Sequence, residues 1–123
     1  MIRYRQITKV QKEEICNGCG AKGGWIKPPN FIFKASCNQH DFYYWRGATE
    51  HERLIADESF YKFMKIDIDE RQYSFLKTAW YHTWAYSYFK AVRIFGKKAF
   101  NFEREMTQAD LDKLDPPKPV NFA

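Results

Sequence analysis

The sequence has no apolar run long enough to span a bilayer, and its first residues lack the apolar stretch of a secretory signal. We therefore expect a protein that is cytoplasmic or is exported by a route other than Sec. Cysteine is scarce, and an odd count of three argues against a full disulfide framework, although one bridge is compatible with it. Internal repeats and low-complexity blocks are absent as well.

Aromatic side chains, by contrast, are abundant. Phe, Tyr and Trp make up 19% of the 123 residues, and hydrophobic residues make up 45%. A chain this rich in aromatics can bury a substantial core, which excludes intrinsic disorder for most of its length. We expect a single domain over residues 1–123, whose proline-rich end at residues 115–123 is an extended, mobile tail.

The net charge is moderately positive. Twenty Lys and Arg residues against 15 Asp and Glu residues give +5. Such an excess favours an anionic partner, either a nucleic acid or a phospholipid surface, without choosing between them.

Helix signals predominate along the chain. Asn30 as a cap and Gly47 as a stop delimit a helical pattern over residues 31–46, and Thr49-Glu50-His51-Glu52 has the form of a capping box that begins a second helix. We expect that second helix to end near Lys65. Further helices are expected over residues 9–15, from about 70 to 95, and over 107–114. The fold class is therefore mostly α, with little sheet.

The short link Gly47-Ala48 predicts that the first two long helices form an antiparallel hairpin. His40 lies seven residues before Gly47, and Asp57 lies nine residues after Ala48. Because a helix rises by about 1.5 Å per residue, these two residues should sit at similar heights on facing helices. The sequence thus predicts an imidazole opposite a carboxylate.

The segment at residues 16–30 is incompatible with regular helix or strand. Four glycines fall within the nine residues from Cys16 to Gly24, and Pro28-Pro29-Asn30 closes the segment. We expect a long shaped loop, of a kind that is usually functional in a compact domain.

One interpretation of this region is structural. A closed zinc site with three thiolates and one imidazole fits the spacing C-x2-C-x17-C-x2-H of Cys16, Cys19, Cys37 and His40. The chain would then be a small interaction or nucleic-acid-binding module held by Zn²⁺ and without catalysis. This interpretation leaves Asp41, Tyr44 and Asp57 unexplained.

A second interpretation is catalytic, and it rests partly on a family resemblance. The run Cys37-Asn38-Gln39-His40-Asp41-Phe42-Tyr43-Tyr44 resembles the C-x-x-H-D-x-x-Y signature of the phospholipase A2 superfamily. Upstream, Cys19-Gly20-Ala21-Lys22-Gly23-Gly24 resembles that family's calcium loop with one extra residue. Downstream, Ala56-Asp57-Glu58-Ser59-Phe60 resembles the A-D-x-x-F motif of its viral capsid and bacterial members. The resemblance covers about residues 16–64, with the three motifs in the family's order.

Chemistry and resemblance suggest the same roles for three residues. His40 would be the general base that activates water, since an imidazole has a suitable pKa. Asp57 would hold the other ring nitrogen and stabilise the imidazolium that forms. Tyr44, one turn after His40, would donate its hydroxyl to the Asp57 carboxylate. A plainer alternative pairs Asp57 with Arg53, four residues earlier on the same helix.

The resemblance also implies a Ca²⁺ ion and a disulfide. Asp41 would bind Ca²⁺, because its side chain diverges from that of His40 by about 100° around the helix. The loop carbonyls of Gly18, Gly20 and Gly23 would complete the site, with Lys22 as an equal alternative to Gly23. The family's disulfide would correspond to Cys19 and Cys37, which leaves Cys16 as a spare thiol.

We therefore expect a phospholipase A2-like domain, with a helix hairpin that carries the site, a third long helix and a glycine-rich metal-binding loop. The expected activity is the calcium-dependent hydrolysis of the sn-2 ester of glycerophospholipids. The expected partner is a phospholipid membrane surface, and no nucleic acid.

Overall fold

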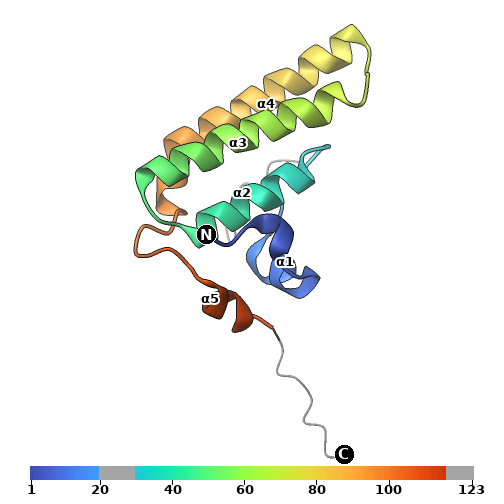
Figure 1. Cartoon of the computed structure of the whole chain (residues 1–123). Helices are drawn as coiled ribbons and strands as arrows, with labels where there is room; N and C mark the ends of the chain where they lie inside the picture. The colour runs from blue at the N-terminus through green and yellow to red at the C-terminus, as the bar shows by residue number, and fades with distance from the viewer. Residues whose placement is uncertain (20–29, 116–123) are drawn as a thin grey trace, which may run out of the picture.

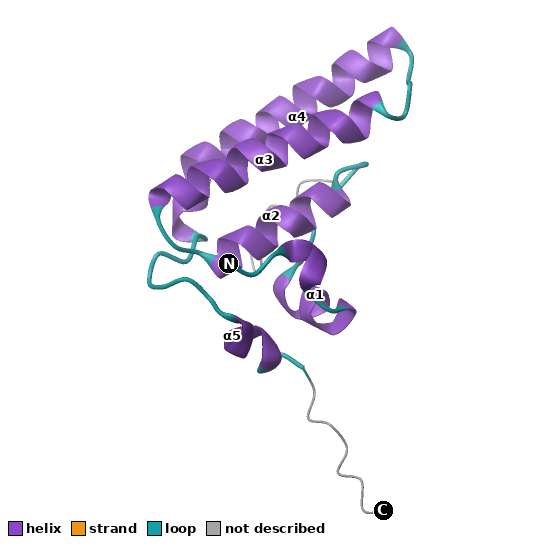
Figure 2. Cartoon of the chain, viewed as in Figure 1, coloured by secondary structure: helices purple, strands orange, loops and turns teal. Residues whose placement is uncertain are grey.

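The computed structural model describes residues 1–19 and 30–115, and every regular element in this part of the chain is helical (Figures 1 and 2). The expectation of a mostly α fold is confirmed. The 3-10 turns are η1 (Tyr4–Gln6) and η2 (Gly96–Lys98), and the α-helices are α1 (Lys9–Ile15), α2 (Lys34–Arg46), α3 (Glu50–Asp69), α4 (Phe75–Phe95) and α5 (Gln108–Asp112). The glycine-rich stretch from 20 to 29 and most of the proposed tail, residues 116–123, lie outside the described residues.

The start of α1 follows directly from its sequence. The Thr8 side chain accepts a hydrogen bond from the Gln11 amide, and the Gln11 side chain accepts one from the Thr8 amide. These two bonds satisfy donors that a helix otherwise leaves free at its first turn. The predicted helix over residues 9–15 is confirmed.

The predicted cap of α2 is wrong. The helix begins at Lys34, and Asn30 instead accepts a hydrogen bond from the Cys19 amide through its side-chain oxygen, 2.8 Å away. The Asn30 carbonyl binds the Phe33 amide, so residues 30–33 form a turn in which Phe31 has a positive φ of 47°. Asn30 therefore joins the end of the glycine-rich segment to its beginning. The predicted stop at Gly47 is confirmed.

α3 begins where predicted but extends further. Thr49 caps it by accepting a hydrogen bond from the Glu52 amide, while the Glu52 carboxylate turns to Arg46 and does not complete the reciprocal box. The helix continues to Asp69 because Met64 and Ile68 remain on its buried side. α4 consequently starts later than expected, at Phe75 after the capping residue Ser74.

The main core lies where α2, α3 and α4 meet, as the bundle in Figure 1 shows. α3 packs against both α2 and α4. The largest fully buried side chains of this cluster are those of Phe33, Met64 and Ile68. A second cluster, around Phe42 and Leu111, attaches α5 and the N-terminal segment to the opposite side of α2. α2 is thus held on both sides, which fixes the direction of its side chains. No helix in the described ranges is long and apolar enough to cross a membrane.

Gly47 occupies a position that only glycine fits. Its φ is +71°, and a Cβ built there would collide with the backbone oxygen of Asn101. The segment around Asn101 runs along the end of α2, because its amide donates to the Tyr44 carbonyl and its carbonyl accepts from the Ala48 amide. The turn between α2 and α3 is therefore locked by a distant part of the chain.

We predict that Gly47→Ala lowers the free energy of unfolding by about 2 kcal/mol or more, since both the backbone conformation and the contact with Asn101 must change. Urea denaturation followed by circular dichroism measures the loss. Lys97→Ala, an exposed change on the nearby η2 turn, serves as the control and should stay within about 0.5 kcal/mol of the parent. Equal stability of the two variants would contradict the locked turn.

Candidate active site

The Asp57 carboxylate is fully buried and receives hydrogen bonds from three helices. His40 and Tyr44 of α2 bind its Oδ1, at 2.7 Å from Nε2 and 2.6 Å from the hydroxyl. Arg53 of α3 and Arg93 of α4 bind its Oδ2, at 3.4 and 2.7 Å. A carboxylate removed from water needs such compensation, and this one has four donors.

The His40 imidazole lies opposite the Asp57 carboxylate, as the heights of the two residues on their helices predict. Its ring lies between Tyr44 and Phe60, with centroid separations of 4.1 and 4.6 Å, and 7% of the residue is exposed. Because the Asp57 carboxylate can only accept, Nε2 carries the proton of their hydrogen bond. Nδ1 is then the nitrogen with a lone pair, and no hydrogen bond reaches it from the described residues.

Burial and charge set the protonation states of the pair. Burial lowers the pKa of His40 and outweighs the opposing effect of Asp57, so the imidazole is neutral at neutral pH. Burial alone would raise the pKa of Asp57, but the hydrogen bonds from His40, Tyr44 and Arg93 hold it below its usual value. Burial raises the pKa of Tyr44, which keeps its phenol protonated as a donor. A neutral imidazole beside an ionised carboxylate is the arrangement that general-base chemistry requires.

Arg93 is the site residue that sequence analysis missed. Its guanidinium binds Asp57 Oδ2 and also Glu50 Oε1, 3.3 Å away. It lies 36 residues beyond Asp57 and comes from another helix, so no local spacing indicates the contact. The plainer alternative, a pair between Asp57 and Arg53, is also present and coexists with the bond to His40.

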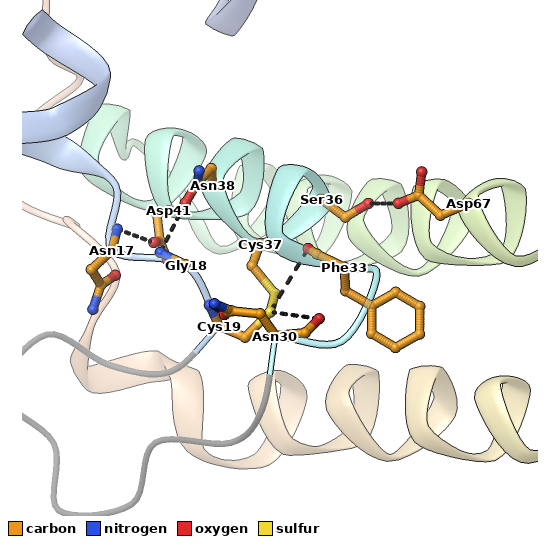
Figure 3. The surroundings of a disulfide bond; sticks show 10 residues. All are labelled: Asn17, Gly18, Cys19, Asn30, Phe33, Ser36, Cys37, Asn38, Asp41 and Asp67. Carbon is orange, nitrogen blue, oxygen red and sulfur yellow. Dashed lines mark hydrogen bonds between the residues drawn. A yellow bond between two sulfur atoms is a disulfide. The ribbon is translucent and has the colours of Figure 1, made fainter. Parts of the chain in front are cut away.

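The Asp41 side chain points toward Asn17, at the beginning of the glycine-rich segment (Figure 3). Its Oδ2 accepts a hydrogen bond from the Asn17 amide at 3.0 Å, and the neighbouring Gly18 amide donates to the Asn38 side chain at 2.8 Å. Within the described ranges no ion pair reaches the Asp41 carboxylate. Burial raises the pKa of Asp41 to about 7.

The Asp41 carboxylate is partly buried and is the described side chain that the resemblance assigns to Ca²⁺. A cation bound there would offset the burial that disfavours its charge, and its oxygens are of the kind that Ca²⁺ prefers. Of the carbonyls assigned to Ca²⁺, that of Gly18 belongs to the described turn. Gly20 and Gly23, with the alternative Lys22, lie outside the described residues.

A disulfide joins Cys19 to Cys37 and ties the glycine-rich segment to α2, one turn before His40 (Figure 3). This is the pairing that the resemblance implies. Cys16 is a free, partly buried thiol that donates to the Asn38 carbonyl at 3.1 Å, and burial raises its pKa to about 12. Its sulfur is therefore protonated and unreactive at neutral pH.

The same disulfide uses two of the thiolates of the alternative zinc set. The fourth ligand of that set, His40, directs Nε2 to Asp57. Among the residues that the structure describes, no group of three or more His, Cys, Asp and Glu side chains could hold a metal ion. A calcium site of the implied kind would depend mainly on loop carbonyls, which are not side-chain ligands.

Comparison with family models, with curated proteins and with solved structures finds no match to this chain.

We predict that Asp57→Asn destabilises the fold by about 3 kcal/mol or more, because it leaves Arg53 and Arg93 without the buried charge that they neutralise. Glu50→Gln is the matched control, since Glu50 contacts the same two arginines but is 47% exposed on its side chain. It should cost no more than about 1 kcal/mol. Thermal and urea unfolding measure the stability of both variants. Similar losses of stability in the two would contradict a special role of the buried Asp57 carboxylate in the fold.

We also predict that Cys19→Ala/Cys37→Ala lowers the free energy of unfolding by about 3 kcal/mol, since the bridge closes a loop with a sequence separation of 18. Cys16→Ala removes the remaining thiol and should cost about 1 kcal/mol or less, the value of one hydrogen bond. Urea unfolding of oxidised protein with and without reductant provides the measurement. If reductant left the free energy of unfolding of the parent unchanged, the prediction would be contradicted.

Proposed function

We propose that the chain is a calcium-dependent, phospholipase A2-like esterase that hydrolyses the sn-2 ester of glycerophospholipids. The observation that carries this proposal is the 2.7 Å hydrogen bond between His40 Nε2 and Asp57 Oδ1. The order of the three motifs, the Tyr44 hydroxyl on the same oxygen and the Cys19–Cys37 bridge support it.

In the proposed reaction, His40 Nδ1 takes a proton from water as the water oxygen attacks the sn-2 carbonyl carbon. Asp57 stabilises the imidazolium that results, while Arg53 and Arg93 keep the carboxylate ionised and fixed in position. The proton then passes from Nδ1 to the glycerol oxygen as its bond to the carbonyl carbon breaks. The products are a fatty acid and a lysophospholipid, and no covalent enzyme intermediate forms.

Asp41 and the carbonyls of Gly18, Gly20 and Gly23 are the proposed calcium ligands. Bound Ca²⁺ would supply the positive charge that the lipid phosphate and the developing oxyanion require. The net charge of +5 favours contact with an anionic vesicle surface, at about 1 kcal/mol for each basic residue near it.

We predict that His40→Gln lowers the rate of fatty-acid release from phospholipid vesicles by about 10²- to 10⁴-fold, the usual contribution of a general base. The chain offers a matched control in a second His–Asp pair, His82 and Asp69, whose Nε2 and Oδ1 are 3.0 Å apart on the surface. His82→Gln should retain the parental rate. Titration of released acid follows the reaction, with circular dichroism to verify folding.

Asp41→Asn tests the metal in the same assay. Release should require added Ca²⁺, stop with a chelator, and fall to background in this variant at every Ca²⁺ concentration. Release by the parent that persists in excess chelator would refute calcium dependence. An absence of release by the folded parent from both neutral and anionic vesicles with Ca²⁺ would refute the esterase itself.

A further inference from the structure

A cavity of about 720 Å³ lies between the N-terminal segment, α2 and α3. Its α2 lining is provided by Gln39, Tyr43 and Arg46. On a helix that turns by about 100° per residue, this lining lies on the side of His40 opposite to Asp41. Neither Asp57 nor Tyr44 contributes to the lining. The cavity is therefore separate from the candidate active site, and its volume is in the range of small-molecule pockets.

Along α3 the lining runs from a charged end to a mainly apolar end that also contains Ser59. Glu52 lies at one end, close to Arg46, and Ile55 and Phe63 follow toward the other. Phe63 comes eleven positions after Glu52 in the sequence, which corresponds to about 16 Å of helix. Ile55 is 43% exposed and Phe63 36% exposed, so this end offers apolar surface to an occupant. A site of this shape suits an elongated molecule with one polar end.

The charged end carries an excess of positive charge. Arg3, Arg5 and Arg46 line the cavity against a single acidic residue, Glu52. The carbonyl of Ile2 accepts from Arg46 Nη1 at 3.2 Å, so the adjoining Arg3 belongs to the same end. The polar end of an occupant should therefore be anionic.

Arg46 provides the independent observation that points to a ligand. Its side chain is 8% exposed, and its contact with Glu52 is long, at 3.4 Å between Nη2 and Oε2. Its guanidinium lies over the Tyr43 ring, and its Nε–H is buried without a hydrogen-bond partner in the described part of the chain. A buried cation with an unmet donor destabilises the unliganded site, and an anion placed beside the guanidinium offsets that cost.

We propose that this cavity binds a single-chain amphiphile with an anionic head. The head, a carboxylate or a phosphate, lies beside Arg46 and Arg3, and the chain lies along Ile55 and Phe63. The proposal does not depend on esterase activity, because none of its residues belongs to the dyad or its supports.

Isothermal titration calorimetry with the full chain tests the site. The probes are dodecanoate and dodecyl phosphate, each below its micellar concentration, with dodecyltrimethylammonium and inorganic phosphate as comparisons. We expect both anionic amphiphiles to bind, with inorganic phosphate at least about tenfold weaker and the cationic amphiphile without measurable binding. A carboxylate-only or phosphate-only response identifies which head group the site prefers and supports it. Equal binding of the cationic and anionic probes would overturn the role of the arginines.

Variants locate the binding. Arg3→Ala/Arg5→Ala removes two exposed charges and should weaken binding by about tenfold or more. The matched control is Lys97→Ala/Lys98→Ala, which removes the same charge from η2, outside the cavity, and should change affinity by less than about twofold. Equal losses in the two double variants would show general charge attraction and overturn the site.

Two further variants separate this site from the dyad. Ile55→Ser should weaken binding of the dodecyl probes while leaving that of inorganic phosphate unchanged. His40→Gln should bind the probes as the parent does. Loss of binding in His40→Gln with full retention in Arg3→Ala/Arg5→Ala would place the probes at the candidate active site and refute the proposal. Circular dichroism of each variant verifies that the helices are intact.

Discussion

The buried charge of Asp57 is the constraint on which the structure depends. A carboxylate withdrawn from water must be compensated by donors, and here the donors come from α2, α3 and α4. Neither α2 nor α4 can therefore shift along α3 without breaking a charge-assisted bond to Asp57. The apolar core formed by Phe33, Met64 and Ile68 supplies burial, and the polar cluster adds directional contacts between the same helices. Stability and the alignment of the dyad thus have a common origin.

Adjacent residues of α2 face different surroundings, because an α-helix turns by about 100° per residue. His40 faces Asp57, whereas Asp41, one position on, faces the turn at Asn17 and Gly18. The Cys19–Cys37 bridge and the Asn30 side chain hold that turn against the helix. Under the proposed function, the base and the anionic calcium ligand would therefore come from adjacent residues that have different partners.

Much of this arrangement can be predicted from the sequence, because it depends on signals between residues that are close together in the chain. Thr8 and Thr49 mark helix starts through side-chain caps, and the short connection at Gly47 brings His40 and Asp57 to one height. The contact of Arg93 with Asp57 could not be predicted from the sequence, because it depends on how α4 crosses α3 and not on any spacing. Asn30 failed as a cap for a similar reason: its side chain serves the Cys19 amide across the chain, which outweighs the local signal for a helix start.

Because Asp57 serves both the fold and the proposed reaction, it is less free to change during evolution than His40 or Asp41. A descendant that no longer needed hydrolysis could replace His40 with another buried hydrogen-bond donor and Asp41 with a neutral residue. It could not discard Asp57 unless Arg53 and Arg93 changed in concert. In such a lineage Asp57 would be retained after His40 was lost. The presence of Asp57 alone would therefore not show that the reaction is retained.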